Sequence, residues 1–186
     1  MSEGTGERRL DAATRGTLLR RARAAIASTI GADLDLPPAT APPPIVRAGA
    51  FVTLRIGGDL RGCIGYPGSD RVLLEVVEQC AISAAVSDPR FPALRAAEWP
   101  LIDLEISVLG PIEPVGGIDE IEIGRHGLIA EFGRRRGLLL PQVAVEWKWD
   151  VEQFASNTCA KAGLPKDAWR NGAKLFKFEA EVFSEK

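Results

Sequence analysis

The chain has 186 residues, of which 46% are hydrophobic and 26% charged, with a formal net charge of −2. That length suits one globular domain, and the balanced charge excludes a general attraction to nucleic acid or to an acidic membrane surface. No apolar run reaches the roughly 18 residues of a membrane-spanning helix, and the polar start predicts no secretory signal. The three cysteines, Cys63, Cys80 and Cys159, fit reduced thiols better than disulfides. We therefore expect a cytoplasmic globular protein.

The first half of the chain predicts two helices separated by a connector and a β-hairpin. A stripe of apolar residues at helical spacing predicts the first helix over 8–30. Residues 1–7 are expected to be disordered, and the proline-rich segment 36–44 predicts an extended connector. Two β-type runs, 51–56 and 60–64, flank the strong turn signal Gly57-Gly58-Asp59. A second helix is expected over 70–87, ending before the two prolines of 88–92.

The second half predicts strands joined by short turns, with one more helix. A strand is expected over 101–109, and a second hairpin over 127–132 and 137–143. The helix over 151–162 begins at an Asp150 cap and ends at Gly163, and a closing strand covers 174–182. Hairpin-linked strands mixed with a few helices predict an α+β fold with mainly antiparallel sheets.

Cys63 is the first candidate for chemistry. Residues two apart in a strand share a face, so Arg61 and Cys63 are expected to point the same way. A guanidinium beside a thiol favours the nucleophilic thiolate, and the bare backbones of Gly62 and Gly65 would let a ligand approach. The alternative is a buried structural cysteine next to a surface arginine. A two-residue Gly57-Gly58 turn would place Val52 opposite Cys63, on a partly apolar face that suits either reading.

His126 and Glu105 are the other candidates. His126 is the single histidine of the chain, and imidazole is the default general acid or base near neutral pH; the alternative is an ordinary loop histidine. Glu105 lies on the polar face of an otherwise apolar strand, where it would orient His126 or neutralise Arg61. A solvated outer face is the alternative reading.

The sequence gives little support for the binding of metals, nucleotides or nucleic acids. The chain has no close pair of metal ligands such as Cys-x-x-Cys, and no phosphate-binding glycine motif. We therefore expect no metal and no cofactor. Arg134-Arg135-Arg136 and Trp147-Lys148-Trp149 are the only hint of RNA binding, and a solvated hairpin tip with partly buried tryptophans is the more economical interpretation.

Taken together, several ordered motifs resemble the AMMECR domain family, and in particular the prokaryotic AmmeMemoRadiSam system protein A group. The resemblance extends from the first helix to the closing strand. It is carried by residues 51–54, 60–65, 88–92, 105–109, 124–128, 137–144 and 162–165, with Trp169 and 176–183. The group usually continues the motif 60–65 with threonine, whereas this chain has Tyr66.

The resemblance implies a single domain over 1–186, built as a two-lobed, two-layer α/β sandwich with intertwined lobes. It also implies a setting, because members look like one component of a system with a Memo-like protein and a radical S-adenosylmethionine enzyme. It carries no settled reaction.

Two functions remain open from the sequence. In the first, the protein is an enzyme with Cys63 as nucleophile or acid/base, His126 as its partner, Arg61 as an anion contact and Glu105 as orienter. In the second, it is a non-catalytic subunit that binds or presents a substrate to the Memo-like protein or the radical enzyme. An RNA-associated role is the weakest alternative because of the net charge.

Overall fold

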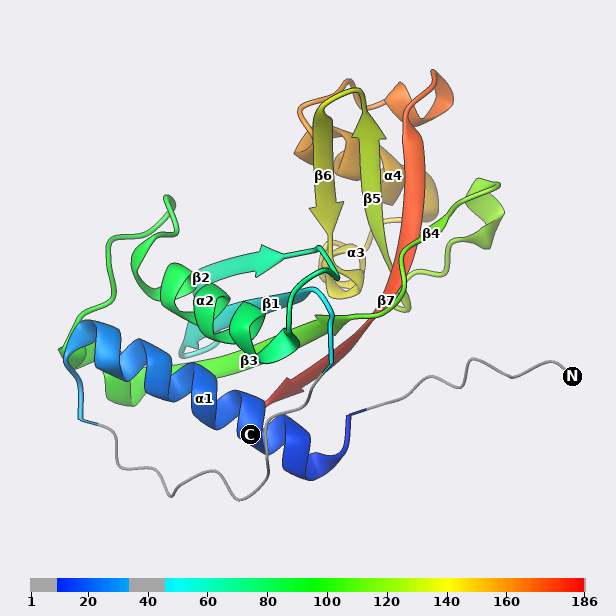
Figure 1. Ribbon diagram of the computed structural model, residues 1–186. Coiled ribbons are helices and arrows are strands. Elements are labelled where there is room, and N and C mark those ends of the chain that lie inside the picture. The colour runs from blue at the N-terminus through cyan, green and yellow to red at the C-terminus, as the bar shows by residue number, and fades with distance from the viewer. Residues whose placement is uncertain (1–9, 34–45, 186) are drawn as a thin grey trace, which may run out of the picture. The chain divides into compact units, whose positions relative to one another are not determined.

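The computed structural model describes residues 10–33 and 46–185. The segments expected to be disordered (1–7) and to form a connector (36–44) lie outside these residues. The chain divides into two compact units, each described here by itself (Figure 1). Unit 1 comprises Met1–Val108 and Glu181–Lys186, and unit 2 comprises Leu109–Ala180. No helix in the described ranges is long and apolar enough to cross a membrane.

Unit 1 has an antiparallel sheet in the order β2-β1-β3, with two helices packed over it. Helix α2 packs on β1 and β2, and α1 packs on α2. A short 3₁₀ helix, Ala96–Leu101, precedes β3. The elements are α1 (Ala12–Ile30), β1 (Ala50–Ile56), β2 (Asp59–Tyr66), α2 (Leu73–Val86) and β3 (Ile102–Leu109).

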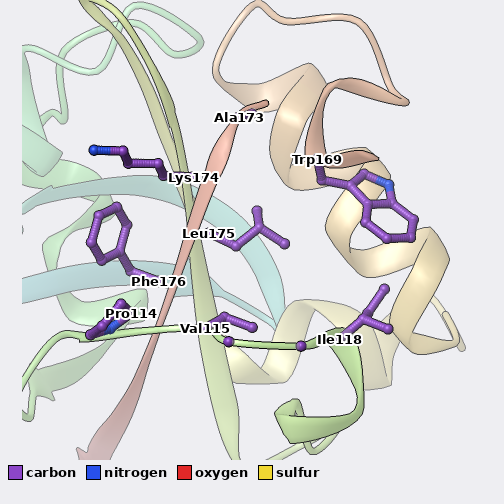
Figure 2. A pocket seen from close by; sticks show the side chains of 10 residues that line it. Pro114, Val115, Ile118, Trp169, Ala173, Lys174, Leu175 and Phe176 are labelled. Carbon is purple, nitrogen blue, oxygen red and sulfur yellow. The ribbon is translucent and has the colours of Figure 1, made fainter. Parts of the chain in front are cut away.

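Unit 2 has an antiparallel sheet in the order β4-β7-β5-β6, with α4 packed on β5 and β6. Figure 2 shows β7 from close by, with Leu175 on one of its sides and Lys174 and Phe176 on the other. The elements are β4 (Glu113–Pro114), β5 (His126–Phe132), β6 (Arg135–Leu139), α3 (Pro141–Glu146), α4 (Val151–Lys161) and β7 (Lys174–Ser184). Strand β7 ends in unit 1, to which its residues from Glu181 belong.

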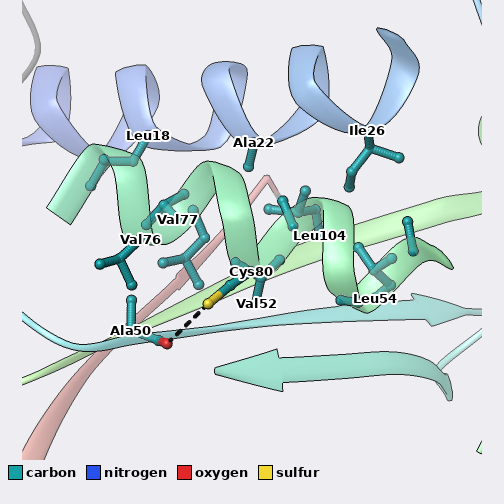
Figure 3. Packing of buried hydrophobic residues seen from close by; sticks show 14 of the residues in the cluster. Leu18, Ala22, Ile26, Ala50, Val52, Leu54, Val76, Val77, Cys80 and Leu104 are labelled. Carbon is teal, nitrogen blue, oxygen red and sulfur yellow. Dashed lines mark hydrogen bonds between the residues drawn. The ribbon is translucent and has the colours of Figure 1, made fainter. Parts of the chain in front are cut away.

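The core of unit 1 is built by the stripes that the sequence predicts. Leu18, Ala22 and Ile26 of α1 are fully buried against α2, whose residues Val76 and Val77 are equally buried (Figure 3). The helix begins at Ala12 because the Asp11 carboxylate accepts the Thr14 N–H, and it ends at Gly31, which has a φ of 67°. Helices on antiparallel sheets in both units confirm the α+β class.

The first hairpin forms as predicted, but its register differs. Gly57 and Gly58 make the two-residue turn, both with positive φ, and Ile56 pairs with Asp59. A bulge follows, because Arg55 pairs with Leu60 whereas Leu54 pairs with Gly62. Arg61 is therefore the extra residue of the bulge, and Cys63 lies opposite Thr53. The prediction that Val52 faces Cys63 was wrong, since turn length alone does not reveal a bulge.

The second hairpin forms too, but the expected strand 137–143 is too long. Strand β6 ends at Leu139, and α3 begins at Pro141. Proline has no N–H for a sheet ladder, whereas its fixed φ suits the first turn of a helix. The prediction for α4 is confirmed, because the Asp150 carboxylate accepts the Gln153 N–H and Gly163 follows with a φ of 72°.

Candidate thiol site

Cys63 lies in β2 with its side chain half-buried. Thr53, its cross-strand neighbour in β1, donates its hydroxyl to the Cys63 Sγ at 3.3 Å. A hydroxyl donor is a favourable contact for a thiolate, because it hydrogen-bonds to the charged form. Thr53 itself is 4% exposed, so this contact is held in a fixed place.

The main chain of Cys63 is bound by the loop that follows α2. Strand β2 is an edge of its sheet, and the Cys63 N–H donates to the Asp88 carboxylate at 2.9 Å. The Arg90 guanidinium donates to the Cys63 carbonyl at 3.1 Å and to Asp88 at 2.7 Å. These side chains satisfy the backbone groups that an edge strand would otherwise expose. Two motifs of the sequence, 60–65 and 88–92, are thus hydrogen-bonded to each other.

The charges of this loop hold each other in their ionised forms. Arg90 and the backbone donors at Cys63 and Arg90 keep the pKa of the Asp88 carboxyl well below its usual range. In return, Asp88 raises the pKa of Arg90, and Cys63 adds to that rise. The Arg90 guanidinium therefore stays charged while it binds the main chain of Cys63.

Arg61 has a different partner from the one expected. Its guanidinium binds Glu98 through two nitrogens, at 2.9 Å and 3.2 Å, and both side chains are mostly buried. Arg61 and, after it, the Arg95 N–H lower the pKa of Glu98 to about 2. This paired geometry ties β2 to the 3₁₀ helix Ala96–Leu101. The predicted role of Arg61 as an anion contact stays a prediction.

The two glycines of the motif are explained by packing. A Cβ at Gly62 would overlap the Ala84 carbonyl oxygen of α2, and a Cβ at Gly65 would overlap the ring of Phe51. Each therefore lets another part of unit 1 come close to β2. Their predicted part in ligand binding stays untested.

Glu105 lies in the same row of residues as the thiol. Thr53 pairs with Cys63 on one side and with Glu105 of β3 on the other. Cross-strand partners share a face, so the carboxylate and the thiol are separated by two strand spacings, about 10 Å. Glu105 also lines a hollow of about 180 Å³ in unit 1, with Asp103 and Ser184 among its neighbours.

His126 begins β5, in unit 2, and is 7% exposed. Its Nδ1 accepts the Glu122 N–H at 3.0 Å, so in the neutral ring the proton sits on Nε2. Burial, followed by the charges of Lys177 and Arg125, lowers the pKa of His126. The imidazole is thus a neutral donor at Nε2. Its predicted partnership with Cys63 stays a prediction, because the two residues belong to different units.

The other two thiols differ from Cys63. Cys80 lies in the α2 face that packs on β1, and burial raises its pKa to about 11. Cys159 is fully buried in α4, and burial raises its pKa as well. Both are packing residues of the core. Within the described ranges, no group of three or more His, Cys, Asp or Glu side chains could hold a metal ion.

The sequence did not reveal Thr53, Asp88 and Arg90 as neighbours of the thiol. In the sequence Asp88 stands in a helix stop and in the motif 88–92, with no sign that its side chain is buried, yet that side chain is 2% exposed. A buried aspartate needs partners, but the partner is the backbone of an edge strand, which no residue type marks. Thr53 was missed because the predicted register put Val52 in its place.

These features define an α+β protein with a half-buried thiol on a side-chain-capped edge strand. The chain belongs to the AMMECR1 family, whose model matches residues 19–183. The matched range takes in β2, the loop after α2 and β5, so every candidate residue lies inside it.

Similar proteins come from archaea. A protein of Methanothermobacter thermautotrophicus is 49% identical over 146 residues, covering 75% of this chain and 76% of that one. A protein of Thermofilum pendens is 43% identical, covering 95% and 92% of the two chains. The crystal structure of the uncharacterized protein PH0010 from Pyrococcus horikoshii is similar, with a TM-score of 0.85, 42% identity and coverage of 95% and 93%.

Proposed function

We propose that the protein is an enzyme in which the Cys63 thiolate is the nucleophile. The observation that carries this proposal is the pair of groups at the thiol, namely the Thr53 hydroxyl donor at 3.3 Å and the Arg90 guanidinium bound to the same residue. The first is a hydrogen-bond donor to the sulfur and the second is a positive charge at the main chain of the same residue, and the thiolate is the reactive form of a cysteine. Cys63 is also the only one of the three cysteines that is not buried.

In this proposal Arg90, and not Arg61, is the guanidinium bound at Cys63, through the Cys63 carbonyl. Arg61 is committed to Glu98 in a two-nitrogen ion pair, whereas Arg90 is half-exposed and keeps its position through Asp88. Asp88 is therefore a positioning residue. Glu105 is a candidate for a second polar contact with a substrate that lies over Thr53, in the same row of the sheet.

The test is the rate at which iodoacetamide alkylates each cysteine at pH 7, followed by peptide mass spectrometry. We expect Cys63 to react faster than a model thiol, with Cys80 and Cys159 as unreactive internal controls. Thr53→Val keeps the shape of the side chain but removes the hydroxyl, and should slow Cys63 several-fold. A Cys63 that reacts no faster than a model thiol, in wild type and variant alike, would refute the proposal.

A second candidate is a non-catalytic subunit that presents a substrate to a Memo-like protein or a radical S-adenosylmethionine enzyme. It is favoured by the structural use of the signature residues, since Arg61, Asp88 and both glycines each make packing or backbone contacts. Co-purification with either partner, together with full system activity of Cys63→Ser, would support this candidate over the first. Loss of activity in Cys63→Ser with binding retained would favour the enzyme.

A further inference from the structure

The hairpin of β5 and β6 carries three successive arginines that the thiol site does not use. Phe132 pairs with Arg135 across a two-residue turn, in which Gly133 has a φ of 61°. The three arginines, Arg134, Arg135 and Arg136, are all exposed. Neighbouring like charges repel each other, so such a run lowers the stability of the folded chain. An anionic ligand at this tip would offset the repulsion.

Lysines from other segments surround the hairpin tip. Arg135 donates to the Gly163 carbonyl at 2.8 Å, so the residues that follow α4 lie beside the tip. A Cβ added to Gly172 would touch the Phe132 ring. Strand β7 begins at the same end of the sheet, because its first residue pairs with Glu131. These segments contribute three exposed lysines, which are Lys161, Lys166 and Lys174.

The acidic residues at this end are few and already bound. Residues 131–136 and 161–174 contain seven Lys or Arg residues but only two Asp or Glu. Glu131 forms an ion pair with Arg136 at 3.8 Å, and Asp167 accepts from the Asn171 amide at 3.0 Å. Among the described residues, Arg134 and the three lysines form no ion pair. The net charge of −2, which argues against nucleic acid for the chain as a whole, therefore does not apply to this end.

Phe132 adds an aromatic ring to these charges. It is 53% exposed, although phenylalanine is usually buried. It lies on the same face of the hairpin as Arg135, its cross-strand partner. Trp147 and Trp149, which the sequence grouped with the arginines, stack on each other after α3, at the other end of β6 (Figure 1). The ring available to a ligand at the tip is therefore that of Phe132.

We propose that the tip of the β5–β6 hairpin binds single-stranded nucleic acid. The phosphates lie against Arg134 and the exposed lysines, and one base stacks on the Phe132 ring. An acidic peptide would use the cations but has no need of the ring, and a duplex offers no free base to stack on it. This site belongs to unit 2 and does not depend on the chemistry proposed for Cys63.

The test is fluorescence anisotropy of the full chain with labelled oligothymidylate and oligouridylate of about twelve nucleotides, the size that one such surface covers. We expect both strands to bind at about 50 mM salt, and the logarithm of the binding constant to fall against that of salt with a slope of about −2, as for three phosphate contacts. Phe132→Ala should weaken binding about tenfold, the order expected of one stacked base. Phe132→Tyr keeps the ring and should bind like the wild type.

Two further variants locate the charge. Arg134→Gln should weaken binding of both strands alike and make the salt slope shallower by about 0.7. Lys148→Gln, an exposed control between the two tryptophans, should leave binding and slope unchanged.

An abasic strand of the same length should bind the wild type as weakly as oligothymidylate binds Phe132→Ala, because it has no base to stack. Absence of binding at low salt, equal binding by Phe132→Ala and the wild type, or equally strong competition by polyglutamate would each overturn the proposal. The last of these would identify the tip as a surface for acidic peptides. Alkylation of Cys63 is unaffected by any of these outcomes.

Discussion

The edge of β2 and the start of β7 both carry backbone groups that no neighbouring strand pairs, but the chain binds these groups differently. At β2, the exposed N–H and carbonyl of Cys63 are bound by Asp88 and Arg90. At the start of β7, the Leu175 carbonyl accepts from the Val115 N–H that follows β4, and the Ala173 N–H donates to the Ala168 carbonyl. An uncovered edge is a template for another chain. Charged side chains close the β2 edge, whereas main-chain groups close the start of β7, which is why we place the chemistry at β2.

The two units also share one packing arrangement. In each, a helix end rests directly on a glycine of a strand: Ala84 of α2 on Gly62, and the Ala162 backbone after α4 on Gly137. A side chain at either glycine would meet main-chain atoms, which cannot rotate away as a side chain can. The two units therefore differ in how their strand backbone groups are bound and not in how their helices pack on the sheets.

The largest expected effect is that of Gly62→Ala. Its Cβ would overlap the Ala84 carbonyl oxygen, so α2 must shift on β2, and we expect a loss of about 3 kcal/mol in the free energy of unfolding. Urea unfolding followed by circular dichroism measures it. Gly16→Ala is the matched control, because its Cβ meets only the flexible Arg20 side chain and alanine favours the helix. Equal stability of the two variants would contradict the close approach.

Asp88→Asn should have the next largest effect, because it opens the β2 edge. The amide keeps the shape but loses the charge that binds Arg90 and the Cys63 N–H. We expect a loss of about 2 kcal/mol at pH 7, as for hydrogen bonds to a buried charged group. Ser69→Asn, an exposed change in the same unit, should be neutral.

The Asp88→Asn variant also tests how the stability of the protein depends on acidic pH. The pKa of Asp88 is lower in the folded than in the unfolded chain, so the stability it contributes is present above the unfolded value near 4 and is lost as the pH falls through the folded value. The wild type should therefore lose more stability than Asp88→Asn between pH 5 and pH 2, values chosen to bracket a carboxyl titration at about 4. Parallel pH curves would show that Asp88 is not held ionised.

Arg61→Lys should cost less, about 1 kcal/mol. Lysine keeps the charge but cannot bind Glu98 through two nitrogens in one plane. A double-mutant cycle with Glu98→Gln measures the coupling between the two side chains. If Arg61 instead serves an anionic substrate, Arg61→Lys will lower activity far more than it lowers stability.

Much of the fold was predictable because the local sequence patterns favour the same helices and turns that the packing of the core requires. Periodicity identified the buried stripes of α1 and α2, the Gly57-Gly58 turn set the first hairpin, and Asp150 set the start of α4. The exceptions have a common cause. The bulge at Arg61 and the two-residue strand β4 depend on contacts distant in the sequence, which no local pattern encodes.

The site was less predictable than the fold. Cys63 was identified from its residue type, but its neighbours Thr53 and Arg90 follow from register and from a loop that folds back on the strand. Arg61 is the opposite case, in which the sequence suggests a contact that does not form. Its closeness to Cys63 in the sequence predicts a contact with the thiol, whereas its guanidinium binds Glu98. Residue type indicates which chemistry is available, while cross-strand geometry decides which groups meet.

The smallest expected effect belongs to His126, whose contribution concerns pH. Burial lowers its pKa, so near pH 6 the unfolded chain binds more protons than the folded one. The stability that this group contributes is therefore complete above the unfolded value of about 6.5 and declines as the pH falls below it. Urea unfolding at stepwise lower pH measures this decline. His126→Gln keeps an acceptor for the Glu122 N–H but has no titration, so its stability should stay flat where that of the wild type falls. An identical slope in both proteins would show that folding does not lower the pKa of His126.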